Sequence, residues 1–202
     1  MSLREWIARR LSVSRPRLAA GDPWVRLPYA PPLRAFGPGA PADFLVYFAG
    51  RSRVEATTPA AIAAWLMTCQ YAGDQQLLGE PDAWQHPCAF EIVRSGDCED
   101  YALWAWRKLV EAGYDATFVV GEHHPTNGVA GRHAWVVFRD QSQDHLLDGV
   151  YHTPQEIIRP CALATQYVPQ VGVTATGRHF VFAGLYQSDW GRTLHVEPHN
   201  PA

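Results

Sequence analysis

The sequence feature that most constrains this chain is a cysteine placed where a turn becomes a helix. Ser95-Gly96-Asp97 is typical of a turn, Cys98 follows it, and residues 101–110 have the pattern of a helix. The first N–H groups of a helix lack partners inside it, and the helix dipole is positive at this end. Both effects favour an anion, so we expect Cys98 to be a reactive thiolate with a lowered pKa.

Two polar residues follow Cys98 at the boundaries of apolar segments. His133 opens the strand-like run 133–139, and Asp148 lies near the end of the next apolar run. Short links between consecutive strands favour antiparallel pairing, which brings distant side chains to one sheet end. A cysteine nucleophile needs an imidazole base and a third group that orients the base. The order Cys98, His133, Asp148 therefore predicts a catalytic triad.

A site for acyl chemistry also needs donors for the negative charge that develops on the carbonyl oxygen. The backbone N–H of Cys98 is one candidate. Gln85 and the Trp84 indole, in the loop before the cysteine, are candidates for a second donor. The alternatives are that Trp84 covers the cleft and that Gln85 is an ordinary loop residue.

Three carboxylates surround the cysteine in sequence: Asp97, Glu99 and Asp100. Carboxylates in a first helical turn stabilise the helix N-terminus, which is the simplest interpretation. The alternative is a calcium site, because hard cations prefer oxygen ligands. These charges also oppose a thiolate, unless they face away from Cys98, are paired, or bind a metal.

The order of the apolar segments predicts an α+β domain in which the cysteine helix packs on an antiparallel sheet. Helices are expected over residues 58–72 and 98–112, and residues 152–177 are expected to be irregular because of Pro154, Pro160 and Pro169. The predicted strands are 116–121, 133–139, 145–151 and 178–186. The predicted organisation is an N-terminal arm packed on the core (1–56), a catalytic core (57–187) and a flexible tail (188–202).

Composition narrows the classes of protein to consider. The chain has 202 residues, a net charge of −3 and no basic block, which argues against a nucleic-acid partner. No apolar run reaches the ~18–20 residues of a membrane span, and the N-terminus lacks the apolar segment of a signal peptide. We therefore expect a cytoplasmic protein, or a periplasmic or secreted one if a leader has been removed. The four cysteines contain no CxxC pair, which argues against a zinc ribbon.

An ordered set of short motifs resembles the core signature of the transglutaminase-like superfamily, closest to the bacterial transglutaminase-like cysteine proteinases. The motifs are Gly96-Asp97-Cys98-Glu99-Asp100-Tyr101-Ala102, Arg132-His133-Ala134-Trp135-Val136 and Leu147-Asp148, and the segment 58–87 resembles the region that precedes the cysteine. The resemblance covers about residues 57–153. It implies a papain-like fold, with Cys98 as nucleophile, His133 as general base and acid, and Asp148 as orienting group. It also implies that calcium dependence is an option, since some bacterial relatives are thought to need it.

The sequence thus predicts a cysteine protease or amidase that hydrolyses peptide or amide bonds through an acyl-enzyme on Cys98. The expected substrate is a peptide or protein, and the hydrolysis itself requires no cofactor. Two alternatives stay open: acyl transfer to an amine, as in transglutaminases, and a non-catalytic binding domain that keeps the fold.

Overall fold

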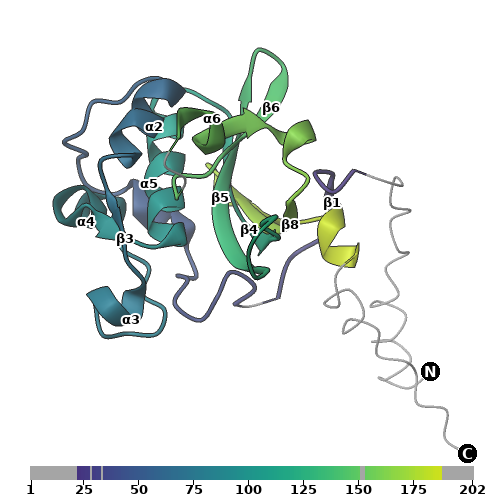
Figure 1. The fold of residues 1–202 in the computed structure, drawn as a ribbon, viewed down its shortest axis with the longest axis horizontal. Coiled ribbons are helices and arrows are strands. Elements are labelled where there is room, and N and C mark those ends of the chain that lie inside the picture. The colour runs from purple at the N-terminus through teal and green to yellow at the C-terminus, as the bar shows by residue number, and fades with distance from the viewer. Residues whose placement is uncertain (1–21, 28, 33, 151–152, 188–202) are drawn as a thin grey trace, which may run out of the picture.

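The computed structural model describes residues 22–27, 29–32, 34–150 and 153–187 (Figure 1). Residues 1–21 of the predicted arm and the predicted tail 188–202 lie outside the described residues. Figure 1 shows helices gathered on one side of a twisted sheet. The predicted α+β class is confirmed.

A sheet of seven strands, all paired antiparallel, forms the larger layer of the described structure. In spatial order the strands are β1 (Arg26–Leu27), β9 (His179–Phe182), β8 (Tyr167–Thr174), β4 (Ala116–His123), β5 (Gly131–Asp140), β6 (Gln143–Leu147) and β7 (Ile158–Pro160). A separate parallel pair, β2 (Gln70–Tyr71) and β3 (Ser95–Gly96), leads into the cysteine helix.

The helical layer is built around α5 (Cys98–Glu111), which is the predicted cysteine helix. The other α-helices are α2 (Pro59–Leu66), α3 (Asp74–Leu77), α4 (Pro87–Val93) and α6 (Pro154–Ile157). Three short 3₁₀ helices complete the described elements: η1 (Phe44–Phe48), η2 (Cys161–Leu163) and η3 (Ala183–Gln187). Helix α2 begins as its sequence indicates, with Thr58 accepting a hydrogen bond from Ala61 N and Pro59 in the first turn.

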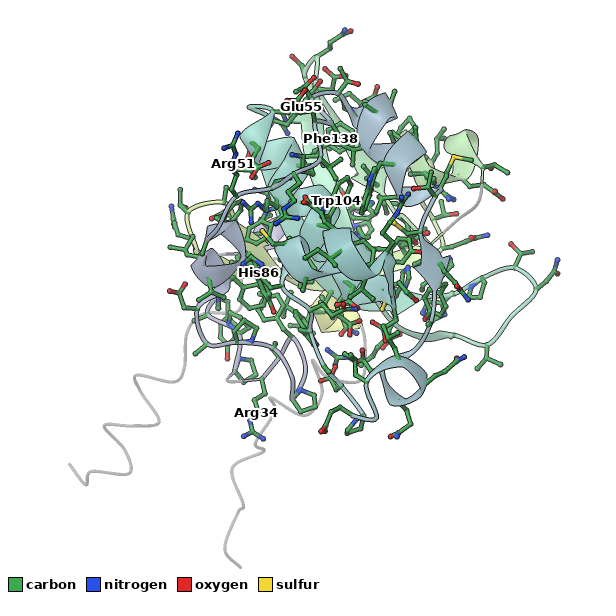
Figure 2. The ribbon with its side chains drawn as sticks, turned by 90° about the vertical axis from the view of Figure 1, so that its left-hand side faces the viewer. Arg34, Arg51, Glu55, His86, Trp104 and Phe138 are labelled. Carbon is green, nitrogen blue, oxygen red and sulfur yellow. The ribbon has the colours of Figure 1, made fainter. Side chains whose placement is uncertain are left out.

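The main hydrophobic core lies between α5 and the central strands. Leu103, Trp104 and Trp106 of α5 are fully buried, and they share this core with Phe118 of β4 and Val136 of β5. Figure 2 labels Trp104 near the centre of the molecule. Burial on this scale, at roughly 25 cal/mol per Å² of apolar surface, anchors α5 against the sheet. The start of α5 is thereby held at one end of β5.

Residues 36–56 pack against the same core. Phe36, Phe44 and Tyr47 are buried, and Phe48 contacts Trp106 with a ring-centroid distance of 4.7 Å. The buried guanidinium of Arg107 in α5 donates to the carbonyls of Tyr47, Ala49 and Gly50. Hydrogen bonds from a charged donor are stronger than neutral ones, so this segment is fastened to the helix.

The prediction for residues 152–177 was wrong. Instead of irregular chain, the structure has α6, β7, η2 and the eight-residue strand β8, which lies between β4 and β9. Pro169 cannot donate a hydrogen bond to a neighbouring strand, but the register of β4 and β8 shifts between Val120 and Gly121, where Pro169 pairs. Gly121 is required there, because an added Cβ would lie 2.2 Å from the Val168 carbonyl oxygen. An irregularity in the pairing thus accommodates the proline.

Other boundaries differ from the prediction. The helix expected over 58–72 ends at Leu66, the strand expected over 145–151 is Gln143–Leu147, and the strand predicted over 178–186 ends at Phe182 and continues as η3. The sequence analysis assigned no helix to residues 87–93, which form α4. All four cysteines lie in the described residues and are free. Among the described helices, none combines the length and the apolar character needed to cross a bilayer.

Candidate active site

Cys98 is the first residue of α5, and a tightly packed turn precedes it. β2 and β3 pair in parallel, with Tyr71 opposite Gly96. An added Cβ at Gly96 would lie 2.1 Å from Asp100 Oδ2, so only glycine fits beside that carboxylate. The N–H of Asp97 donates to the same Oδ2 at 3.3 Å. This contact fixes the turn immediately before the cysteine.

His133 and Asp148, predicted as base and orienting group, are hydrogen-bonded to each other. His133 Nε2 lies 2.6 Å from Asp148 Oδ2. His133 is near the start of β5, and Asp148 directly follows β6, the neighbouring strand. The Asp148 side chain is 1% exposed and that of His133 13%. Burial acts to raise the pKa of Asp148, but His133, Tyr167 and the Val150 N–H together hold it below its ordinary value.

Tyr167 is a residue of this site that the sequence analysis missed. Its hydroxyl donates to Asp148 Oδ2 at 2.7 Å, the oxygen that also contacts His133. Tyr167 is the first residue of β8, within the segment predicted to be irregular. A lone tyrosine between prolines carries no motif, so no sequence signal marked it.

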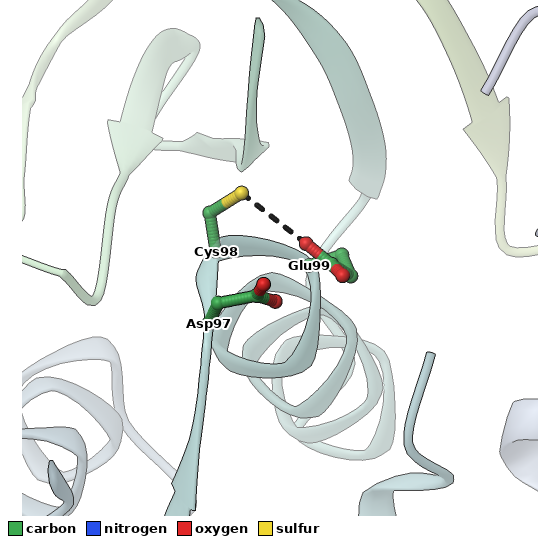
Figure 3. Close-up of side chains that lie close together, drawn as sticks. All are labelled: Asp97, Cys98 and Glu99. Atoms are coloured by element: carbon green, nitrogen blue, oxygen red, sulfur yellow. Dashed lines mark hydrogen bonds between the residues drawn. The ribbon is translucent and has the colours of Figure 1, made fainter. Parts of the chain in front are cut away.

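The Cys98 thiol donates to the Glu99 carboxylate, with the sulfur 3.2 Å from Oε2 (Figure 3). Burial, followed by the charges of Glu99 and Asp97, raises the pKa of Cys98 well above its ordinary value. The expected lowering of this pKa is therefore wrong. The helix N-terminus is present as predicted, but burial and two adjacent carboxylates outweigh it.

Within the described residues, no hydrogen bond joins Cys98 to His133. The backbone of Ala134, the residue after His133, acts to lower the thiol pKa. Cys98 thus lies against the strand that carries the histidine. Catalytic hydrogen bonds are often long in the absence of substrate, so the lack of a Cys98–His133 hydrogen bond is compatible with a catalytic role for both residues.

The N–H groups of Gln85 and Trp84 are engaged with other residues. Gln85 Nε2 donates to the Ser95 carbonyl at 3.0 Å and to Asp100 Oδ2 at 2.5 Å, and Gln85 N donates to Asp100 Oδ1 at 2.8 Å. The Trp84 indole donates to Asp82 Oδ1 at 2.9 Å. Gln85 therefore holds Asp100 in place, and an oxyanion role would require either side chain to give up these bonds.

The three carboxylates near Cys98 have three different surroundings. Asp100 points away from the sulfur toward Gln85, and burial raises its pKa to about 7. Glu99 faces the thiol, and Asp97 faces Asp74. Burial raises the pKa of both Asp97 and Glu99. Their contact raises the pKa of Glu99 further, whereas it acts to lower that of Asp97.

Asp74 and Asp82 extend this acidic cluster beyond the predicted residues. Carboxylate oxygens of Asp74, Asp82 and Glu99 lie within 4.8 Å of one another, as do those of Asp74, Asp97 and Asp100. Oδ1 of Asp74 and Oδ1 of Asp97 are buried and have no hydrogen-bond partner. In the described part of the chain, no lysine, arginine or histidine forms an ion pair with these five residues. Buried, unpaired carboxylate oxygens fit a hard cation.

No family model matches the chain, and no curated protein matches it. Solved structures do resemble it. Calcium-bound LapG of Legionella pneumophila is 18% identical over 68% of this chain and 74% of that one, with a TM-score of 0.49. The EGTA-treated form is 19% identical over 69% and 72%, with a TM-score of 0.47.

A Cytophaga hutchinsonii protein described as a "Putative Cysteine Protease" is 13% identical. It matches over 61% of this chain and 44% of its own length, with a TM-score of 0.39. At these identities and TM-scores, no role is carried over from these proteins to this chain.

Proposed function

We propose that this protein hydrolyses peptide or amide bonds with Cys98 as nucleophile, His133 as general base and acid, and Asp148 as orienting group. The observation that carries the proposal is the 2.6 Å hydrogen bond between His133 Nε2 and buried Asp148 beside a helix-N-terminal cysteine. Because Asp148 contacts Nε2, the other ring nitrogen, Nδ1, is the one that exchanges a proton with the thiol.

The chemistry proceeds in two steps. His133 accepts the thiol proton, and the Cys98 sulfur bonds to the substrate carbonyl carbon. The C–N bond then breaks, the amine leaves with the proton from His133, and an acyl-thioester stays on Cys98. Water, deprotonated by His133, attacks this thioester and releases the acid and the free thiol. The backbone N–H of Cys98, unpaired at the helix start, is suited to stabilise the developing oxyanion.

The test is hydrolysis of a peptide library by the full chain with and without Cys98→Ala. Loss of all cleavage in Cys98→Ala, with retention in the matched variant Cys69→Ala, supports the proposal. Adding hydroxylamine separates water from an amine as acceptor, because transfer yields a hydroxamate in place of the acid. Equal cleavage by Cys98→Ala and wild type would rule the mechanism out.

We also propose that the acidic cluster beside Cys98 binds calcium. The residues suited to hold the cation are Asp74, Asp97 and Glu99, and the two unpartnered buried oxygens are the reason to expect one there. Asp82 and Asp100 belong to the same cluster, but their oxygens already accept hydrogen bonds, those of Asp82 from Gly39 N and the Trp84 indole and those of Asp100 from Gln85. A bound cation supplies positive charge next to the thiol, which opposes the effect of the carboxylates on Cys98.

A further inference from the structure

Both oxygens of the Asp148 carboxylate are held by donors. Oδ2 accepts from His133 Nε2 and from the Tyr167 hydroxyl, and Oδ1 accepts from Val150 N at 3.1 Å. A carboxylate that accepted only the histidine bond would be free to rotate about its Cβ–Cγ bond. The Tyr167 hydroxyl removes that freedom at the oxygen that contacts His133.

The Tyr167 ring is itself immobilised from several directions. The His123 ring stacks on it at 4.4 Å with an interplanar angle of 16°, and Trp135 meets it edge-on at 5.1 Å. The Arg159 guanidinium lies 5.6 Å from the ring centroid. The residue is 1% exposed. Because the ring cannot swing, its hydroxyl is a donor in a fixed position.

We propose that Tyr167 is a positioning residue for catalysis. Its hydroxyl holds the Asp148 carboxylate in one orientation, and this carboxylate in turn holds the His133 ring. This role rests on the hydrolase function proposed above. Tyr167 belongs to β8 and Asp148 directly follows β6, with β4 and β5 between these two strands, so the hydrogen bond joins distant strands of the sheet. The orientation of the histidine thereby depends on the pairing of β8 with β4.

Several groups besides Tyr167 face Asp148 and act on its charge. They are His133 from β5 and, at longer range, His123 from β4 and Tyr71 from β2. The Tyr167 bond favours the ionised carboxylate. Its removal is therefore expected to let Asp148 take up a proton at higher pH, which weakens the hold on His133 at the acidic end of the pH range.

The experiment compares Tyr167→Phe with Tyr114→Phe in the full chain. Tyr114 is also partly buried against an aromatic ring, Phe138, at the opposite end of β5 from His133. Phenylalanine keeps the ring contacts and removes only the hydroxyl. We expect Tyr167→Phe to lower kcat by about ten- to a hundredfold, as losses of partners that orient active-site ligands typically do. KM should stay unchanged, because the tyrosine does not touch the substrate, and the acidic limb of the pH profile should move to higher pH.

A second measurement is independent of catalysis. The His133 Nε2 proton, observed by ¹H–¹⁵N NMR, is expected to exchange faster with water in Tyr167→Phe than in wild type or Tyr114→Phe. If this exchange and kcat both match those of Tyr114→Phe, Tyr167 has only a packing role and the proposal is overturned. If the proton exchanges faster in a protein that cleaves nothing, the positioning role stands and the hydrolase function fails.

Discussion

The sulfur of Cys98 lies 3.2 Å from Oε2 of Glu99, and the thiol donates its hydrogen bond to that carboxylate (Figure 3). The proposed nucleophile thus donates to a carboxyl group whose ionised form opposes a thiolate. Burial and the two adjacent carboxylates, Glu99 and Asp97, keep the thiol protonated. Activation consequently requires either a proton acceptor such as His133 or a cation that neutralises the cluster.

Glu99→Gln is expected to make Cys98 more reactive in the metal-free protein. Removing the carboxylate charge removes a repulsion that disfavours the thiolate, so the pKa of Cys98 falls. The measurement is the rate of iodoacetamide labelling at Cys98 between pH 8 and pH 11 in EGTA, read by peptide mapping, because the pKa of Glu99 is raised to about 9 and its carboxyl is ionised only in this range. Labelling should begin at lower pH in Glu99→Gln, while the exposed-site control Glu80→Gln should follow wild type. Identical labelling profiles for all three proteins would show that Glu99 does not affect the pKa of Cys98.

Calcium is expected to stabilise the folded protein. A ligand that binds only the folded state adds about 2.7 kcal/mol at a concentration 100 times its Kd. Thermal unfolding in calcium and in EGTA measures the effect. Asp97→Asn and Asp74→Asn should each reduce the shift, because each removes a charge at a buried oxygen that lacks a partner. Asp115→Asn, at an exposed position, should keep the full shift. A wild-type melting temperature that is unchanged by calcium would refute the site.

The metal-free protein is expected to lose stability as the pH rises from about 4 to about 7. Burial raises the pKa of Asp100 to about 7, while the unfolded chain keeps the ordinary value of 3.8. Between these values the folded state binds more protons at Asp100, so the contribution of this group to the free energy of unfolding decreases with rising pH and levels off above pH 7. The raised pKa of Glu99 extends the decrease to higher pH. The lowered pKa of Asp148 has the opposite sign, but it acts only below its ordinary value of 3.8. The lowered pKa values of His123 and His179 also have the opposite sign and act up to their ordinary value of 6.5, so they offset part of the decrease.

Urea unfolding in EGTA at intervals from pH 4.5 to pH 8 measures this dependence. Asp100→Asn should flatten the curve, since it removes one of the titrating groups, whereas Asp115→Asn should leave the slope as in wild type. A wild-type stability that increases over this range would mean that the acidic cluster is paired in some other way.

Asp148→Asn is expected to reduce hydrolysis on the order of 10⁴-fold, since an amide cannot hold the histidine in the required tautomer. The buried position also accepts hydrogen bonds from Tyr167 and Val150, so a thermal melt should accompany the assay. Asp144→Asn is the matched control, because Asp144 lies in β6, the strand that Asp148 follows, and forms an ion pair with exposed Arg139. Equal losses in the two variants would exclude a specific role for Asp148.

Gly96→Ala is expected to destabilise the protein by about 1–3 kcal/mol, as insertions into a packed interior usually do. The new Cβ would lie 2.1 Å from Asp100 Oδ2 and would displace the carboxylate that fixes the turn before Cys98. Gly73→Ala is the control, since nothing lies within 4 Å of a Cβ there. Chemical denaturation of both variants measures the difference, and equal stabilities would show that the turn adapts without cost.

Much of the fold could be predicted from the sequence because helix starts depend on residues that are adjacent in the chain. Thr58-Pro59 predicted where α2 begins, and Ser95-Gly96-Asp97 predicted where α5 begins, because capping depends on neighbouring residues. Strand β8 was missed because Pro169 argues against a strand, and only its position at a register shift makes it acceptable. That shift is a property of two paired strands and cannot be seen in either one.

By itself, the sequence determined the helix-N-terminal cysteine, the strand that carries His133 and the choice of Asp148 as its partner. The tertiary structure alone decided how charges and donors are shared among them. In the folded protein, the Tyr167 hydroxyl donates to Asp148 and the Cys98 thiol donates to Glu99. Gln85 donates to Asp100, and Asp74 lies in the acidic cluster. The physical reason is that burial and non-local contacts set pKa values and hydrogen-bond partners, whereas spacing along the chain sets only which elements form.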